Sequence, residues 1–366
     1  MPTARPSIVV TGACGNLGRR LLPLLSGFRV LALDMHPPAE ALAGGAEFER
    51  LDLGQESSCN RIVELLRAND CAAVVHLAFV IDPQQTGVLD ETRMWQINVA
   101  GTARVVEAIA ETNRLGGHVE RFVVPSSVSV YGPETTGEVM EDYPLNAYGL
   151  AYAVHKKEAD RVVQARARHL GLCSTFLLRP HIFAGQSMQN YLVGALRGTP
   201  TGRGKLGGWL RRKKVRMPML LPWGESYRQK RFQFVHVDDV ARLIVHILEC
   251  DLAGPELRVL NVAGRGESIT LGRCAEVAGA KVRRLPTQAL CRLALRLLWD
   301  AGISAVPPDA LPYMCGSYTM NTAQLRKFLG DQYRHIIRYT NEEALADSFA
   351  PAPTTLDRPE RLTAAR

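Results

Sequence analysis

The stretch at residues 7–20, SIVVTGACGNLGRR, decides the fold. Its apolar run at 8–10, Ile-Val-Val, is too short for a helix and is rich in β-branched residues, which predicts a buried strand. A glycine-rich turn follows, and from Asn16 onward leucines recur at helical spacing. A strand, a glycine turn and an amphipathic helix in this order are typical of a dinucleotide-binding site.

The turn contains glycines in the spacing G-x-x-G-x-x-G. Glycine adopts positive φ easily and lets the backbone approach a bound group closely. The start of the following helix offers free N–H groups and the positive end of the helix dipole to a pyrophosphate. Such a triplet alone marks only a tight strand–helix turn, so the prediction depends on the flanking elements. The cofactor contacts predicted here are Gly12, Gly15, Asn16, Leu17 and Gly18.

Length and composition restrict the class of protein. The 366 residues are enough for one large α/β domain, or for a large and a small one. No apolar stretch approaches the roughly 20 residues that span a bilayer, and no signal-peptide pattern precedes the first strand. The eight cysteines are scattered without a C-x-x-C pair. We therefore expect free thiols, a cytoplasmic location and no metal site.

The net charge of +8 is concentrated in one segment. Residues 197–231 contain eleven Lys and Arg but one acid, Glu225, so this segment carries +10 and the remainder of the chain −2. A nucleic-acid-binding domain usually combines a basic face with a recognition motif, and none accompanies this charge. We expect no nucleic-acid partner.

Further short apolar runs alternate with helical patterns along the first half of the chain. The predicted strands are 29–34, 48–53, 72–77, 121–125 and 173–178, and the main predicted helices are 57–68, 91–112 and 146–169. Strands without polar alternation, separated by helices, predict an α/β fold with a Rossmann-type, doubly wound parallel sheet. Ligands of such sheets bind at the carboxyl ends of the strands.

The clean alternation ends near residue 185. Residues 233–248 give a short strand and a helix, 257–262 give another strand, and 271–348 are mainly helical in pattern. We therefore predict a dinucleotide-binding domain over 1–184 and a smaller, mainly substrate-binding part over 185–350. Residues 233–262 are expected to return to the core, and 351–366 to form a disordered tail.

Asp34 ends the second predicted strand, about 20 residues after the glycines. A carboxylate there accepts both hydroxyls of an adenosine ribose and repels a 2′-phosphate. No Lys or Arg follows it directly, since the next residues are Met35, His36, Pro37 and Pro38. The expected cofactor is therefore NAD, although a solvated loop acid would look the same in sequence.

A candidate proton relay comes from two separate motifs. Tyr152 and Lys156 lie four residues apart on a predicted helix, so they share one face. The run PSSVSVYG at 125–132 follows the fifth strand and brings two serines to its carboxyl end. An ammonium group lowers the pKa of a nearby phenol, and a serine hydroxyl can hold a reacting oxygen. Beside a nicotinamide, these groups would take a proton from an alcohol while its carbon loses hydride.

With these motifs the chain resembles an extended short-chain dehydrogenase/reductase of the NAD-dependent epimerase/dehydratase type. The resemblance covers about residues 7–265, with a closing motif at 320–330. Its motifs occur in family order: TGACGNLG, Asp52-Leu53, HLAF at 76–79, INVAGT at 97–102, SSVSVYG, Tyr152-x-x-x-Lys156, LRP at 178–180 and FVHVDDVA at 234–241.

The resemblance implies roles for individual residues. It implies Ser127, rather than Ser126, and Tyr152, rather than Tyr148, as catalytic residues together with Lys156. Further cofactor contacts that it implies are Asp34, Asp52, Leu53, Leu77, Ala78, Phe79, Asn98, Pro125, Tyr152, Lys156 and Pro180. The implied substrate contacts are Ser127, Val128, Tyr148 and His181. Asp160, where the family usually has Glu, is interpreted as structural.

Departures from the family pattern narrow the reaction. Sugar dehydratases carry an Asp-Glu pair where this chain has Val128 and Ser129, and decarboxylating members have Glu in place of Ser129. The reaction types that remain are oxidation, reduction and epimerisation through a ketone. Ile182 replaces an Asn that holds the substrate, and Phe232 replaces an Arg that grips the diphosphate, with Lys230 and Arg231 beside it. Two roles remain open for His181 and for His236: each is either a polar group of the active site or a structural histidine.

The resemblance predicts an NAD-dependent epimerase or dehydrogenase of a secondary alcohol, with a nucleotide sugar as the leading substrate. An apolar, sterol-like or lipid alcohol is the alternative, and a non-catalytic NAD sensor is another. A homodimer packed through helices 91–112 and 146–169 is expected. Three roles remain open for residues 209–223, WLRRKKVRMPMLLPW. The segment could be a solvated loop, a lid that grips a phosphate, or a patch for peripheral membrane contact.

Overall fold

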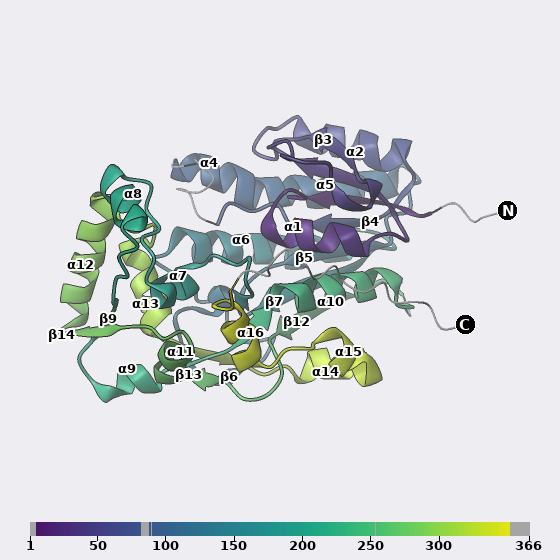
Figure 1. Ribbon diagram of the computed structural model, residues 1–366. Coiled ribbons are helices and arrows are strands. Elements are labelled where there is room, and N and C mark those ends of the chain that lie inside the picture. Colours follow the sequence, from purple (N-terminus) through teal and green to yellow (C-terminus); the bar gives the residue numbers. More distant parts are fainter. Residues whose placement is uncertain (1–4, 82–87, 89, 253, 352–366) are drawn as a thin grey trace.

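The computed structural model describes residues 5–81, 88, 90–252 and 254–351 (Figure 1). At its centre lies a seven-stranded sheet in the order β12-β7-β5-β4-β1-β2-β3, in which all neighbours are parallel. The strands are β1 (Ser7–Thr11), β2 (Arg29–Asp34), β3 (Glu47–Arg50), β4 (Cys71–His76), β5 (Arg121–Pro125), β7 (Ser174–Pro180) and β12 (Leu257–Val262). The predicted Rossmann-type parallel sheet is confirmed.

The sheet is doubly wound from its middle. The chain starts at β1, runs outward to β3, and then crosses back to β4 and runs outward to β12. The order therefore reverses between β1 and β4. In open α/β sheets a ligand crevice forms at the carboxyl ends of the strands beside such a reversal, which is where the glycine turn follows β1.

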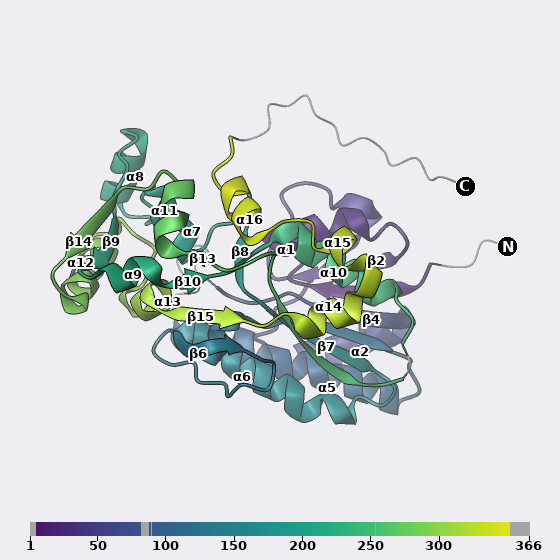
Figure 2. The same cartoon turned by 90° about the horizontal axis from the view of Figure 1, so that it is seen from below.

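Apolar residues on both faces of the strands hold the helices in place. In β1, Ile8 and Val10 join one apolar cluster with α1 (Asn16–Leu21) and α10 (Val237–Glu249). Val9 points to the other face, where it joins a cluster with α2 (Ser58–Ala68), α5 (Gly101–Arg114) and α6 (Ala151–Arg166). Figure 2 shows the sheet between these two groups of helices. Burial on both faces explains why the strands read as continuous apolar runs.

A separate apolar cluster draws on residues 128–153 and on much of the second half of the chain, whereas α10, β12, α14 (Ala323–Leu329) and α15 (Tyr333–Ile336) pack with the sheet and α1. The remaining short strands pair two by two: β8 with β11, β9 with β14, β6 with β15, and β10 with β13. These strands are β6 (Glu134–Val139), β8 (Ile182–Ala184), β9 (Met219–Pro222), β10 (Arg231–Phe232), β11 (Phe234–His236), β13 (Ile269–Thr270), β14 (Val282–Leu285) and β15 (Ser317–Met320). The other helices of the second half of the chain are α7 (Tyr191–Arg197), α8 (Lys205–Arg212), α9 (Glu225–Gln229), α11 (Leu271–Val277), α12 (Gln288–Asp300), α13 (Leu311–Cys315) and α16 (Asn341–Asp347).

Two predicted helices have different bounds in the structure. The helix predicted over 91–112 is α4 (Glu91–Trp95), one π-helical turn at Gln96–Ala100, and then α5. The helix predicted over 146–169 begins at Ala151, because Gly149 has φ +75° and the backbone before it is held by another segment. Across the ranges that the structure describes, no helix is long and apolar enough to cross a membrane. Of the predicted tail at 351–366, residues 352–366 lie outside the described residues.

Candidate active site

The glycine turn is built by close backbone contacts. Gly12 has φ +68°, and a Cβ added to it would lie 2.5 Å from the amide nitrogen of Ala78, in the turn after β4. A Cβ on Gly18 would lie 2.4 Å from the carbonyl oxygen of Ala13. Two of the three glycines are therefore required for packing, while Gly15 is exposed at the start of α1. The turn has the open, side-chain-free form that suits a pyrophosphate.

Asp34 lies at the end of β2 with its carboxylate against this turn. Its Oδ2 accepts a hydrogen bond from the Cys14 N–H at 3.0 Å, and its Oδ1 accepts one from the His36 N–H at 3.1 Å. The carboxylate is therefore held beside the glycine turn. Asn16 is bonded differently: its amide donates to the Ser187 carbonyl at 2.5 Å and accepts from the Ser187 hydroxyl at 3.0 Å.

The other predicted adenine-side residues are held by local contacts. Asp52 accepts from the Gly54 N–H at 2.9 Å and forms an ion pair with Arg93, whereas Leu53 is buried in the core. Asn98 is fully buried, and its amide both accepts from the N–H and donates to the carbonyl of Val80. Asn98 thus fixes the backbone just after the predicted contacts Leu77, Ala78 and Phe79.

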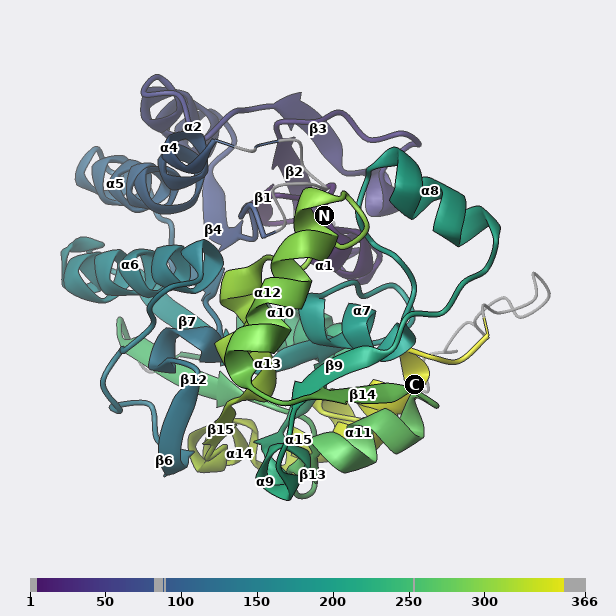
Figure 3. The same ribbon diagram turned by 90° about the vertical axis from the view of Figure 1, so that its left-hand side faces the viewer.

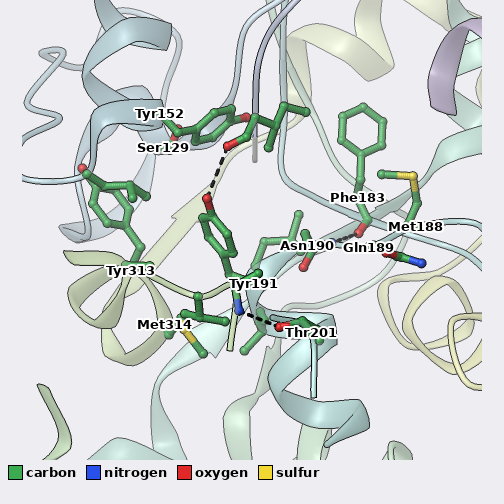
Figure 4. A pocket seen from close by; sticks show the side chains of 18 of the residues that line it. Ser129, Tyr152, Phe183, Met188, Gln189, Asn190, Tyr191, Thr201, Tyr313 and Met314 are labelled. Atoms are coloured by element: carbon green, nitrogen blue, oxygen red, sulfur yellow. Dashed lines mark hydrogen bonds between the residues drawn. The ribbon is translucent and has the colours of Figure 1, made fainter. Parts of the chain in front are cut away.

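Ser127 and Tyr152 come together where β5 ends and α6 begins. Both side chains line the same cavity, and burial raises the pKa of the Tyr152 phenol while the neighbouring Ser127 hydroxyl lowers it. Ser127 Oγ accepts from the Ser129 N–H at 3.2 Å and from the Ser129 hydroxyl at 3.0 Å. Ser129, at the position where other family members carry an acid, thereby orients Ser127. In Figure 4 Tyr152 and Ser129 lie at the same edge of the cavity.

Lys156 lies one turn beyond Tyr152 and is buried. Its ammonium donates to the Pro125 carbonyl at 2.8 Å and lies 3.7 Å from the centre of the Phe79 ring. Burial lowers the pKa of Lys156 to about 7, against the attraction of Asp160. In this arrangement the ammonium faces Phe79, and the expected effect of Lys156 on the pKa of Tyr152 stays a prediction.

Asp160 and Ser126 belong to a structural network. Both carboxylate oxygens of Asp160 bind the guanidinium of Arg179 at 2.9 Å, and both side chains are almost fully buried. The Ser126 hydroxyl donates to the same carboxylate at 2.7 Å. The interpretation of Asp160 as structural agrees with these contacts, because its acceptor capacity is used by this network.

A cavity of about 640 Å³ opens beside Tyr152. Ser127, Val128, Pro180 and His181, which were predicted as substrate or cofactor contacts, line it. The remaining wall is largely apolar and comes from distant segments: Leu150, Ile182, Phe183, Tyr191, Leu192, Val306, Ala310, Tyr313, Met314 and Tyr318. Figure 4 shows Tyr191 pointing across the cavity, where its hydroxyl donates to the Ile81 carbonyl at 3.3 Å. Sequence patterns gave no signal for Tyr191 or Tyr313.

Two histidines were candidates for direct roles. His181 accepts from the Ile182 N–H at 2.9 Å through Nδ1, so Nε2 carries the hydrogen that reaches the Tyr318 carbonyl at 2.7 Å. Burial lowers the pKa of His181 to about 4, so the ring is a neutral part of the cavity wall. His236 begins α10, where it accepts from the Asp238 N–H at 3.2 Å, and its other nitrogen bonds to Asp347 at 3.1 Å.

The structure differs from the prediction for Tyr148. Its side chain is 60% exposed, whereas the described wall of the cavity has Tyr313 on that side. The Tyr313 hydroxyl accepts from the Tyr148 N–H at 3.1 Å and donates to the Tyr148 carbonyl at 3.0 Å. These bonds hold the backbone of Tyr148 outside α6, and Tyr148 is not among the residues that line the cavity.

The basic groups near Phe232 do not enter the cavity. Phe232 is fully buried, Lys230 pairs with Glu134, and Arg231 donates to Ser268 at 2.9 Å. Arginines from another segment line the cavity instead: Arg197, Arg203 and Arg211. The guanidinium of Arg211 is fixed by the Pro200 and Gly202 carbonyls, at 3.0 and 2.6 Å.

This combination of a doubly wound sheet, a glycine turn and a Ser-Tyr-Lys cluster defines a nucleotide-dependent oxidoreductase class. Residues 8–263 match the model of the NAD dependent epimerase/dehydratase family. The chain belongs to this family, and its cofactor is NAD.

Individual known proteins are similar over parts or all of the chain. D-erythronate dehydrogenase of Cupriavidus necator is 29% identical over 164 residues, which cover 40% of this chain and 48% of the relative. UDP-glucose 4-epimerase of Bacillus subtilis is 29% identical over 149 residues, 38% of this chain and 42% of the relative. The match thus spans about half the length of these relatives. The structure of MoeE5 with UDP-glucuronic acid and NAD has a TM-score of 0.61 at 22% identity, covering 94% and 97% of the two chains.

Proposed function

We propose that this protein oxidises, reduces or epimerises a secondary alcohol, with Tyr152 as the acid/base. The observation that carries this proposal is that Ser127, Ser129 and Tyr152 line one cavity of about 640 Å³, in which the Ser129 hydroxyl donates to Ser127 Oγ. Bound NAD supplies the hydride acceptor. Ser127 holds the substrate hydroxyl in line with the Tyr152 oxygen, and Ser129 keeps the Ser127 hydroxyl in place.

Lys156 has two functions in this proposal. Its position one turn from Tyr152 allows it to favour the ionised phenol and to bind the ribose of the nicotinamide half. In the described arrangement it is held by the Pro125 carbonyl and the Phe79 ring. Gly12, Gly18 and Asp34 would hold the other half of NAD, because they form the turn and the ribose-binding edge described above.

A nucleotide sugar is the leading substrate class. The support comes from the similarity to a UDP-glucose 4-epimerase and from the arginines that line the cavity, of which Arg211 is fixed by two carbonyls. Guanidinium groups suit a diphosphate. An apolar alcohol is the second candidate, because the wall beside Tyr152 is formed by residues such as Val128, Ile182 and Tyr313.

The eight cysteines are all free thiols in the structure. This supports our proposal of a cytoplasmic location, where thiols stay reduced.

The test is turnover of a panel of nucleotide sugars and apolar secondary alcohols, guided by mass spectrometry of copurifying small molecules. Tyr152→Phe removes the proton acceptor and keeps the ring, so turnover should fall by about 10²–10⁴-fold while NAD binding persists. Tyr148→Phe is the matched control, since its phenol is exposed outside the cavity. Wild-type turnover in Tyr152→Phe would show that the site assignment is wrong.

A further inference from the structure

One end of the molecule carries an apolar helix face that faces outward. On α12, Leu290, Leu293 and Leu297 are 43%, 54% and 61% exposed. Their spacing of three and four residues puts them in one stripe along the helix. Cys291 and Leu295, on the opposite side of α12, are buried. The helix therefore packs on the core with one apolar face and presents a second apolar face to solvent.

α8 adds to this surface. Leu206 and Trp209, three residues apart, are both 47% exposed. Gly207 lies on the inner side of α8, where a Cβ would lie 2.6 Å from the carbonyl oxygen of Gly302, two residues after the end of α12. This contact fixes α8 at the C-terminal end of α12. Figure 3 looks onto the end of the molecule that both helices form.

We name this surface the end patch. It comprises Leu206, Trp209, Val215, Trp223, Leu290, Leu293 and Leu297. These are seven of the sixteen large apolar side chains that are exposed among the described residues. Single exposed apolar residues are normal, but a gathering of this kind marks an interaction surface.

Uncompensated positive charge borders the end patch. The side chains of Lys205, Arg212, Lys213 and Lys214 are exposed and form no ion pair or hydrogen bond within the described part of the chain. Arg284, Arg292 and Arg296 are instead paired with acids, namely Glu225, Asp309 and Asp300. The end patch thus combines exposed leucine and tryptophan with free ammonium and guanidinium groups.

We propose that the end patch docks on the surface of an anionic lipid bilayer. Leucine and tryptophan would enter the boundary between headgroups and acyl chains, while the basic side chains would contact anionic headgroups. A second copy of this chain fits less well, because a symmetric contact would bring the two basic clusters together. Nucleic acid would use the charge but leave the leucine stripe without a partner.

The end patch adjoins the cavity beside Tyr152. Thr199 and Thr201, on the segment that leads into α8, and Val306, on the segment that follows α12, line that cavity. Docking would therefore bring one wall of the cavity to the membrane surface. This inference goes beyond the proposed function and does not depend on it.

The test is flotation of the full chain with vesicles of phosphatidylcholine alone, or of phosphatidylcholine mixed with phosphatidylglycerol. We expect binding to the mixed vesicles only, with the emission of Trp209 and Trp223 shifting to shorter wavelength. Leu293→Glu/Leu297→Glu, and separately Arg212→Gln/Lys213→Gln/Lys214→Gln, should each weaken binding at least about ten-fold.

Leu172→Glu is the matched control, because Leu172 is 79% exposed in the loop before β7 and should leave vesicle binding unchanged. Retained NAD binding checks that each variant is folded. The proposal is overturned if the wild type does not float with mixed vesicles, or if the leucine variant binds them as well as the wild type does.

Discussion

We predict that Asp34 decides which dinucleotide the glycine turn accepts. Its carboxylate is held beside the turn by the Cys14 N–H at 3.0 Å. Asp34→Ala should weaken NADH binding about 10–100-fold, the size of a lost charged hydrogen bond, while NADPH binding should weaken less or improve. Calorimetry with both cofactors measures the change.

Asp34→Asn separates charge from loop structure, because it keeps an oxygen for the Cys14 N–H. It should relieve the discrimination against NADPH and leave thermal stability near that of the wild type. Tighter binding of NADPH than of NADH by the wild-type protein would contradict this interpretation of Asp34.

Lys156 links the site to pH. Burial lowers its pKa from 10.5 to about 7 in the folded protein. Between these values the unfolded chain holds a proton that the folded chain has lost, so stability rises with pH across this window. Below about pH 7 both states are protonated, and the full cost of burying the ammonium is present.

Lys156→Met should therefore be more stable than the wild type in acid, by up to about 5 kcal/mol, and this advantage should shrink toward pH 10.5. Denaturant unfolding without added NAD, at about pH 6 and about pH 9, measures the difference in the free energy of unfolding between Lys156→Met and the wild type. An equal difference at both pH values would show that the Lys156 ammonium is not desolvated in the folded protein.

At the scale of elements, local sequence was informative for the sheet. The strands at Arg29–Asp34, Arg121–Pro125 and Leu257–Val262 have their predicted bounds, because burial on both faces leaves an uninterrupted apolar run. The strand predicted over 48–53 ends at Arg50. Asp52 turns the chain there by accepting from the Gly54 N–H, and a hydrophobic pattern does not report such a bond.

The residues of the candidate site likewise fall into some that the sequence could predict and some that it could not. Residues at or just beyond the carboxyl end of a strand, such as Asp34 and Ser127, could be predicted because the ends of parallel strands meet at one edge. Tyr191, Arg211 and Tyr313 could not, since their approach to Tyr152 depends on how short C-terminal elements pack. Tyr148 was misplaced for the same reason, because Tyr313, which holds its backbone, is 165 residues away.

For the whole molecule, we predict a homodimer through α5 and α6. These helices pack side by side and share the Arg166–Glu107 ion pair (Figure 3). Val154 and Val162 lie two turns apart on α6 and are only half-buried, outside the apolar clusters of the core. A partner helix would cover them, and this contact lies on other helices than the end patch.

Light scattering tests this assembly against the chain mass of 40.3 kDa. The wild type should have twice that mass at micromolar concentration. Val154→Glu/Val162→Glu should give the monomer, because a carboxylate buried without a partner is strongly unfavourable. Leu24→Glu, at a side chain 43% exposed beside α1, should leave the dimer intact. A wild type that remains a monomer would exclude this interface, and a Val154→Glu/Val162→Glu variant that stays dimeric would move the contact to another face.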